Sequence, residues 1–220
     1  MTEKKENLFT IACDMDDVLM VPHTYIEFSK YLEIYEQFSI PLVEYKNGKR
    51  SYKSLWENWY KIINQFTTIE KRAAINHVAE KISANTYRFV ENSKKLGRFI
   101  IVSNNDGDLV KAIAEKFEVE YIAVNKYIFE YCLDTQKKSE AIKKLNINID
   151  AAITDDPVNE KDFLDLPIAN KGVNISCGIV VHRNDMPPES YNITAGYKVV
   201  NALDEVLAQL LLIKDEIKRK

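Results

Sequence analysis

The sequence predicts an α/β fold with a Rossmann-like, mostly parallel sheet as its core and a small helical cap inserted after the first strand. Two observations predict it. Short apolar runs alternate with segments of helical periodicity along most of the chain, and this alternation is typical of a parallel sheet with helices on both faces. A long helical stretch rich in aromatic residues separates the first apolar run from the second, and it is longer than a simple crossover requires.

The expected strands and helices follow one another in a regular order. The first apolar run ends in acidic residues, as a short buried strand can, and the later runs are similarly short. The last helix is amphipathic, because charged residues interrupt its apolar positions. We expect strands over residues 8–13, 98–102, 121–124, 151–154, 178–182 and 197–200, and helices over residues 109–117, 139–145 and from near 202 onward.

The same pattern predicts two structural units. Residues 1–21 and 93–220 are expected to form the α/β core, and residues 22–92 are expected to form the helical cap. Asn47-Gly48, a turn signal, divides the cap segment.

Composition limits the classes of function. The chain has 220 residues, of which 46% are hydrophobic and 29% are charged, an ordinary globular mixture. The formal net charge of −3 does not favour binding to a nucleic-acid polymer. No apolar run is long enough to cross a membrane. Three cysteines without CxxC spacing and an N-terminus without an apolar signal favour a reduced, cytoplasmic protein. Both a monomer and a homodimer fit the sequence.

Polar residues of a restricted kind follow three of the expected strands. In open α/β sheets, ligands bind beyond the carboxyl ends of the strands. A lysine at the start of the helix before the 151–154 strand can reach the same crevice. The residues concerned are Asp14, Asp16 and Asp17 after the first strand, Ser103 and Asn104 after the second, Asp155 and Asp156 after the 151–154 strand, and Lys137 or Lys138.

These residue types suit phosphoryl transfer. A carboxylate can attack phosphorus and form an aspartyl phosphate. Clustered carboxylates repel a phosphate dianion, so a cation is required, and hard oxygen ligands favour Mg²⁺. A second acid can protonate the leaving oxygen and later activate water, while a hydroxyl and a lysine hold the non-bridging oxygens. Taken alone, the acids after the first strand could instead cap the next helix.

Four segments resemble the motifs of the haloacid dehalogenase superfamily, and they occur in the family's order. IACDMDDVL resembles the first motif and FIIVSNN the second. KSEAI resembles the third, with its lysine at a helix start, and AAITDDP resembles the fourth. The resemblance spans nearly the whole chain. It implies the haloacid dehalogenase fold and Mg²⁺-dependent hydrolysis of a small phosphorylated substrate.

The resemblance assigns the reacting groups by position. Asp14 would be the nucleophile, and Asp16 would be the general acid and base, with its backbone carbonyl on the metal. An acid at the position of Asp16 marks the phosphatases and phosphotransferases of the family, whereas its dehalogenases lack it. Asp17 departs from the glycine that is frequent at its position, a substitution that some members tolerate.

The binding groups follow from the same resemblance. Ser103 and Asn104 would hold the phosphoryl oxygens, and Lys138 would neutralise them, because KSEAI fits the third motif better than the frame that starts at Lys137. Lys138 could instead be a solvated helix lysine. Many members carry another acid four or five residues after the first acid of the fourth motif. In this sequence those two positions hold Asn159 and Glu160. The expected metal ligands are therefore Asp14, Asp16, Asp155 and Asp156.

Several alternatives stay open at this point. The same fold could serve a phosphomutase or phosphotransferase, or a catalytically silent ligand-binding protein. A receiver-like signalling domain uses similar residue types, but the long insertion and the DxD spacing disfavour it. The helical cap and the late strand also resemble 5′(3′)-deoxyribonucleotidases, which implies a (deoxy)nucleoside monophosphate. The cap aromatics are expected to pack as core rather than stack on a base, and His23 is expected at the surface.

Overall fold

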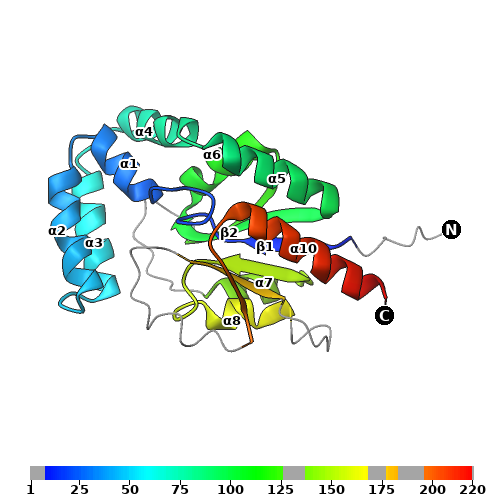
Figure 1. Cartoon of the computed structure of the whole chain (residues 1–220). Coiled ribbons are helices and arrows are strands. Elements are labelled where there is room, and N and C mark those ends of the chain that lie inside the picture. Colours follow the sequence, from blue (N-terminus) through cyan, green and yellow to red (C-terminus); the bar gives the residue numbers. More distant parts are fainter. Residues whose placement is uncertain (1–7, 126–136, 168–176, 183–195, 220) are drawn as a thin grey trace.

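A six-stranded parallel sheet forms the centre of the molecule (Figure 1). The computed structural model describes residues 8–125, 137–167, 177–182 and 196–219. Within these ranges every strand pairing is parallel, which confirms the predicted fold class. The strands are β1 (Thr10–Cys13), β2 (Arg98–Asp106), β3 (Glu120–Asn125), β4 (Ala151–Thr154), β5 (Gly178–Val181) and β6 (Lys198–Val200).

The strand order is β3-β2-β1-β4-β5-β6, so the direction of winding reverses beside β1. Ile11 of β1 pairs with Phe99 of β2 on one side and with Ala151 of β4 on the other. A crevice forms at such a reversal, outside the carboxyl ends of the strands. The topology therefore places the residues that follow β1, β2 and β4 around one crevice.

Alternation along the strands divides the core between the two faces of the sheet. Ile11 and Cys13 of β1 face the larger apolar cluster, whereas Ala12 faces the smaller one. The larger cluster is covered by α5 (Ala84–Leu96), α6 (Gly107–Phe117) and α10 (Leu203–Lys218), and the smaller one by α7 (Lys138–Lys144) and α8 (Lys161–Leu164). Figure 1 shows these two layers above and below the sheet.

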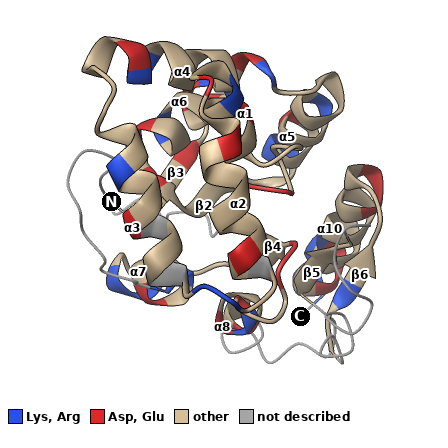
Figure 2. Ribbon diagram, turned by 90° about the vertical axis from the view of Figure 1, so that its left-hand side faces the viewer, with Lys and Arg blue, Asp and Glu red and all other residues tan. Residues whose placement is uncertain are grey.

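Five helices lie between β1 and β2, as the periodicity predicts. They are α1 (Thr24–Tyr31), α2 (Tyr35–Lys46), α3 (Tyr52–Ile63), α4 (Thr68–Glu80) and α5. The hairpin of α2 and α3 stands apart from the sheet on the side to which the strands' carboxyl ends point (Figures 1 and 2). By contrast, α5 contacts β2 and α10, and α4 contacts α6. The cap boundaries at residues 22 and 92 stay a prediction, but the last helix of that range packs on the core.

Local sequence explains where these helices begin and end. Ser51, Thr67 and Ser83 are the N-caps of α3, α4 and α5, and each side chain accepts a hydrogen bond from a backbone N–H of the first turn. The predicted turn at Asn47-Gly48 separates α2 from α3, and Gly48 has a φ of 69°, which glycine adopts without strain.

The aromatic residues of the insertion form core, as expected. Trp59 of α3 is 1% exposed and packs edge-on against Tyr25, Phe28 and Phe38. Tyr60 and Phe66 are partly buried, while the side chain of Trp56 lies outside the described part. In the described ranges, no helix has the length and apolar character needed to span a bilayer.

Candidate active site

Asp14 directly follows β1 and lies at the centre of the crevice. It continues the face of the sheet to which Ala12 belongs, and α7 covers that face. Lys138, the first residue of α7, places its Nζ 2.7 Å from Asp14 Oδ1. Both residues are buried, at 7% and 4% exposure. The alternative of a solvated Lys138 is therefore wrong. Lys137 instead has a side chain that is 65% exposed and that faces Asp162.

Glu160 is a site residue that the sequence prediction left out. Its Oε1 lies 2.5 Å from Lys138 Nζ, and its Oε2 accepts a hydrogen bond of 2.7 Å from Thr154 Oγ1. The turn after β4 brings Glu160 back toward the strand end. The signal was present in the sequence, because an acid at this distance from Asp155 is frequent in the family's fourth motif.

Two buried carboxylates compete for the single charge of Lys138. Burial raises the pKa of Asp14 to about 7; Lys138 opposes the shift, and Asp155 and Asp16 add to it. Burial likewise raises the pKa of Glu160 to about 7, and Asp14 adds to it. Burial alone would lower the pKa of Lys138, but the two carboxylates outweigh it and raise that pKa above its usual range. The cluster therefore holds two carboxyl groups around one cation, and burial disfavours the charged form of both.

The donor set around Asp14 fits a divalent cation with hard oxygen ligands. Asp155, 7% exposed at the end of β4, is close enough to raise the pKa of Asp14 by charge repulsion. In the ranges that the structure describes, no three His, Cys, Asp or Glu side chains form a complete metal cage. Mg²⁺ does not need one, because it keeps several waters and binds through one or two carboxylates. Asp14 and Asp155 meet that requirement.

Asp156 lies next to this pair but uses its carboxylate in a turn. Its Oδ1 accepts hydrogen bonds from the backbone N–H groups of Val158 and Asn159, at 3.1 and 3.0 Å, and its Oδ2 accepts one of 2.7 Å from Asn159 Nδ2. This arrangement shapes the loop that returns Glu160 to the site. The predicted role of Asp156 as a metal ligand stays a prediction, and the geometry gives that residue a structural task.

Asp16 is held on the other side of the crevice by the neutral side chains of Thr24 and Asn105. Its Oδ1 accepts hydrogen bonds from Thr24 Oγ1 at 2.6 Å and from Thr24 N at 2.9 Å. Its Oδ2 accepts one of 2.7 Å from Asn105 Nδ2. His23 Nδ1 lies 3.3 Å from Asp16 Oδ1. His23, expected as a surface residue, is thus partly buried beside the candidate general acid.

Ser103 and Asn104 lie near the carboxyl end of β2, beside the crevice. Ser103 is 2% exposed, and its Oγ accepts a hydrogen bond of 3.0 Å from the backbone N–H of Asn105. That bond uses a lone pair of the oxygen, so the hydroxyl proton stays available as a donor. Asn104 is partly buried. β2 runs to Asp106, further than predicted, because the polar run after Val102 stays extended.

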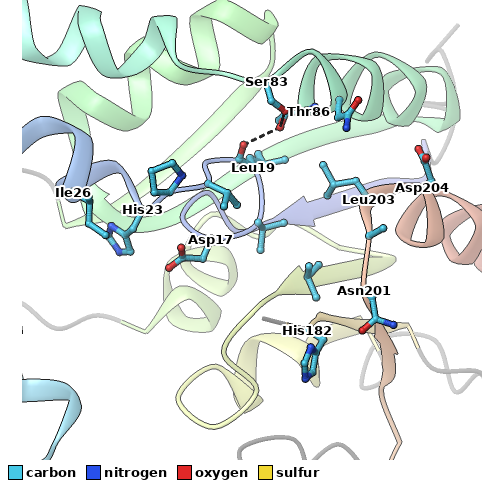
Figure 3. Close-up of a pocket in the computed structure, with 16 residues that line it drawn as sticks. Asp17, Leu19, His23, Ile26, Ser83, Thr86, His182, Asn201, Leu203 and Asp204 are labelled. Carbon is cyan, nitrogen blue, oxygen red and sulfur yellow. Dashed lines mark hydrogen bonds between the residues drawn. The ribbon is translucent and has the colours of Figure 1, made fainter. Parts of the chain in front are cut away.

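A cavity of about 630 Å³ adjoins the loop that follows Asp16 (Figure 3). Asp17 and His23 line it on the side of that loop, and His182 and Asn201 line it from beyond β5 and β6. The Thr86 hydroxyl, at the start of α5, donates to the carbonyl of Leu19 at 3.1 Å and anchors the loop. Among the described residues, the lining includes two carboxylates, Asp17 and Asp204, and no lysine or arginine.

The sequence matches no protein-family model and no curated protein. Solved structures do match. A haloacid dehalogenase family hydrolase from Salmonella enterica serovar Typhi superposes with a TM-score of 0.61 at 15% identity, over 87% of this chain and 66% of that one. A phosphoserine phosphatase from T. onnurineus superposes with a TM-score of 0.57 at 17% identity, over 92% and 94% of the two chains. This chain has the haloacid dehalogenase fold.

Proteins of different lengths superpose on the chain. The structure of DsGPDH of Dunaliella salina superposes with a TM-score of 0.67 at 15% identity, over 92% of this chain but only 36% of that one. The chain thus spans about a third of the Dunaliella protein and just under two thirds of the Salmonella hydrolase. At these identities the likeness establishes the haloacid dehalogenase fold, and the four predicted motifs lie at the strand and helix ends of that fold.

Proposed function

We propose that the chain is a Mg²⁺-dependent phosphatase that hydrolyses the phosphate monoester of a small metabolite through an aspartyl phosphate on Asp14. One observation carries the proposal. The carboxylate of Asp14 is buried at the switch point of the sheet, 2.7 Å from the Lys138 ammonium group and beside Asp155. A nucleophile, a fixed positive charge and a second carboxylate for a cation thereby converge on one point.

The first step transfers the phosphoryl group to the protein. Asp14 attacks phosphorus in line, a bond forms between its carboxylate oxygen and phosphorus, and the bond from phosphorus to the leaving oxygen breaks. Lys138 and Ser103 hold the non-bridging oxygens, where negative charge spreads in the transition state. Asp16 gives a proton to the leaving oxygen, which departs as an alcohol.

The second step releases phosphate. Asp16, now ionised, takes a proton from a water molecule, and the water oxygen attacks the phosphorus of the aspartyl phosphate. The bond between phosphorus and Asp14 breaks, which restores the carboxylate. Bound at Asp14 and Asp155, with the backbone carbonyl of Asp16 as a further ligand, Mg²⁺ would offset the repulsion between the carboxylates and the phosphate dianion.

The cavity beside the 17–23 loop supports a leaving group of metabolite size. Its volume of about 630 Å³ lies within the range of small-molecule sites. Asp17 and Asp204 would repel a leaving group that carries a second phosphate, and the described part of the cavity lining provides no lysine or arginine to bind one. This favours esters with a single phosphate, among them nucleoside monophosphates and sugar monophosphates. One matching structure is cytosolic 5′-nucleotidase IIIB bound to cytidine, at 10% identity and a TM-score of 0.56.

The test is phosphate release from a panel of nucleoside monophosphates, sugar phosphates, phosphoserine and p-nitrophenyl phosphate, with Mg²⁺ or with EDTA. We expect release that requires Mg²⁺ and that falls by at least about 10³-fold in Asp14→Asn, because an amide cannot act as the nucleophile. Asp215→Asn on the exposed face of α10 is the matched control and should behave as the wild type.

Two outcomes would overturn the proposal. Turnover retained in Asp14→Asn would show that the reaction does not pass through an aspartyl phosphate on Asp14. The absence of phosphate release from every ester would favour a catalytically silent binding protein. A phosphotransferase would be recognised by faster transfer of the phosphoryl group to an added alcohol acceptor than to water.

A further inference from the structure

The side chains of Asn105 and Thr24 form a closed arrangement with the carboxylate of Asp16. Asn105 Nδ2 lies 2.7 Å from Asp16 Oδ2 and 2.6 Å from Thr24 Oγ1. Thr24 Oγ1 in turn lies 2.6 Å from Asp16 Oδ1. Asn105 and Thr24 are 3% and 0% exposed. Asn105 is the last residue of the FIIVSNN segment that resembles the second motif, but that resemblance assigns it no role.

For the carboxylate form of Asp16, the donors and acceptors assign the hydrogen atoms of this arrangement. Asn105 Oδ1 accepts a hydrogen bond of 2.6 Å from the backbone N–H of Asp106, which fixes the other end of the amide as the donor. The two amide hydrogens then go to Asp16 and to the oxygen of Thr24. The Thr24 hydroxyl has one hydrogen, and it points to Asp16. Each donor of the two side chains has one acceptor, so both carboxylate oxygens of Asp16 are held.

An irregularity in the backbone around Asn105 directs this side-chain amide toward Asp16. β2 pairs regularly with β3 up to Ser103, and the register shifts between Ser103 and Asp106. Such irregularities re-aim side chains next to active sites. An aspartate at position 105 has the same size but donates nothing and would repel Asp16. Alanine has no donor at all. Asparagine is therefore the residue type that the geometry requires.

We propose that Asn105 is a positioning residue that, together with Thr24, fixes the carboxylate of Asp16 for proton transfer. The inference rests on the proposed function and extends it to a residue to which the four motifs assign no role. Asp16 follows the strand by three residues and sits on a loop, where its side chain would otherwise visit several rotamers. Proton transfer requires the acid within hydrogen-bond reach of the leaving oxygen and later of the water.

Thr24 gives the arrangement a second consequence. It is the first residue of α1, so the same hydrogen bonds join three separate segments: the loop after β1, the end of β2 and the start of the helical insertion. The backbone N–H of Asn105 also holds Ser103 Oγ. Asn105 thereby sets the distance between the group that binds phosphate and the group that moves protons.

The experiment follows both proton transfers in Asn105→Ala. The p-nitrophenolate anion leaves without being protonated, whereas the leaving oxygen of an alkyl phosphate needs a proton from the general acid. With the best alkyl phosphate of the panel we expect turnover to fall by about 10- to 100-fold, a part of what general acid catalysis contributes. With p-nitrophenyl phosphate we expect a rapid burst of one equivalent of nitrophenol per enzyme, followed by slow steady turnover, because Asp16 no longer activates water well.

Three further variants separate positioning from a loss of structure. Asn92→Ala removes a surface asparagine of α5 that bonds only Lys95 in the described contacts, and it should match the wild type. Thr24→Val removes the second donor and should reproduce the burst, which keeps the test valid if Asn105→Ala does not fold. In an Asp16→Asn background, Asn105→Ala should change turnover by less than about twofold, because its partner is already lost.

Two results would overturn the inference. Equal losses with the alkyl and the aryl ester, without a burst, would give Asn105 a purely structural role. Additive losses in the Asp16→Asn double variant would do the same. Failure of the proposed function would appear differently, as full turnover in Asp14→Asn with both esters.

Discussion

The two sides of the crevice are built from different kinds of interaction. On the side of α7, Asp14, Lys138 and Glu160 form a buried cluster of charges, with contacts of 2.5 to 2.7 Å. On the side of α1, Asp16 is held by the neutral side chains of Thr24 and Asn105. We infer that the two sides have different functions. The charged side stabilises the charge that develops on the phosphoryl group, and the neutral side fixes the position of the carboxyl group of Asp16, which transfers protons. Changes in charge should therefore cost most on the first side.

After the loss of Asp14, the largest expected effect comes from removing the lysine. Lys138→Met keeps the length of the side chain but removes its charge, and we expect kcat/KM to fall by about 10²- to 10³-fold, the usual cost of losing a group that stabilises transition-state charge. Steady-state kinetics with the best substrate would measure it. Lys137→Met is the matched control, because that side chain is 65% exposed and points to Asp162. A larger loss in Lys137→Met would reverse the assignment of the two lysines.

A smaller effect concerns the cation and pH. Because burial raises the pKa of Asp14 to about 7, Mg²⁺ must displace a proton from this carboxylate below that pH. We expect the apparent affinity for Mg²⁺ to rise about tenfold per pH unit up to pH 7 and then to level off. Calorimetric titration between pH 5.5 and 8 would measure the affinity directly, without turnover.

The expected dependence on pH can be contradicted in a simple way. An affinity for Mg²⁺ that stays constant over this range would show that no carboxyl group near the ion titrates there. Asp155→Asn, which removes the second expected ligand, should weaken binding at every pH. If it does not, the ion binds elsewhere.

The smallest effect concerns stability on the neutral side, where Asp106 caps α6. Its Oδ1 accepts hydrogen bonds from the N–H groups of Asp108 and Leu109, while its Oδ2 has no hydrogen-bond partner within the described residues. Burial raises the pKa of Asp106 to about 7. The folded state therefore binds this proton more tightly than the unfolded state. The stabilisation is complete below the unfolded pKa near 4 and is lost as the pH rises through 7.

Asp106→Asn removes this titration. Between pH 5 and 8, the free energy of unfolding of the wild type should fall relative to the variant by about 2 to 3 kcal/mol. Urea denaturation at several pH values would measure the difference, in which the contributions of Asp14 and Glu160 cancel because both proteins contain them. A difference that does not change with pH would show that Asp106 is ionised in the folded protein throughout.

Much of the fold could be predicted from the sequence, because buried strands and their polar ends leave a local pattern. The strand ends at Asp14 and Asp155 are examples, whereas β2 continues past Ser103 to Asp106. Asn105 and Glu160 were missed for a different reason. Their side chains reach the site through a register shift in β2 and a turn after β4, and neither feature has a periodic signature. The choice between Lys137 and Lys138 likewise depended on burial.

The central position of β1 also shapes how the protein can fold. β1 precedes both of its neighbours in the chain, yet Thr10 pairs with Arg98 of β2, and Ile11 with Ala151 of β4. On the ribosome, the apolar strand that leads to Asp14 must wait for the whole helical insertion, and then for β4, before its two edges are covered. Pairings of such long sequence separation form slowly and leave strand edges exposed meanwhile. The strand that leads to Asp14 is therefore a segment that stays exposed to chaperones until much of the chain has been synthesised.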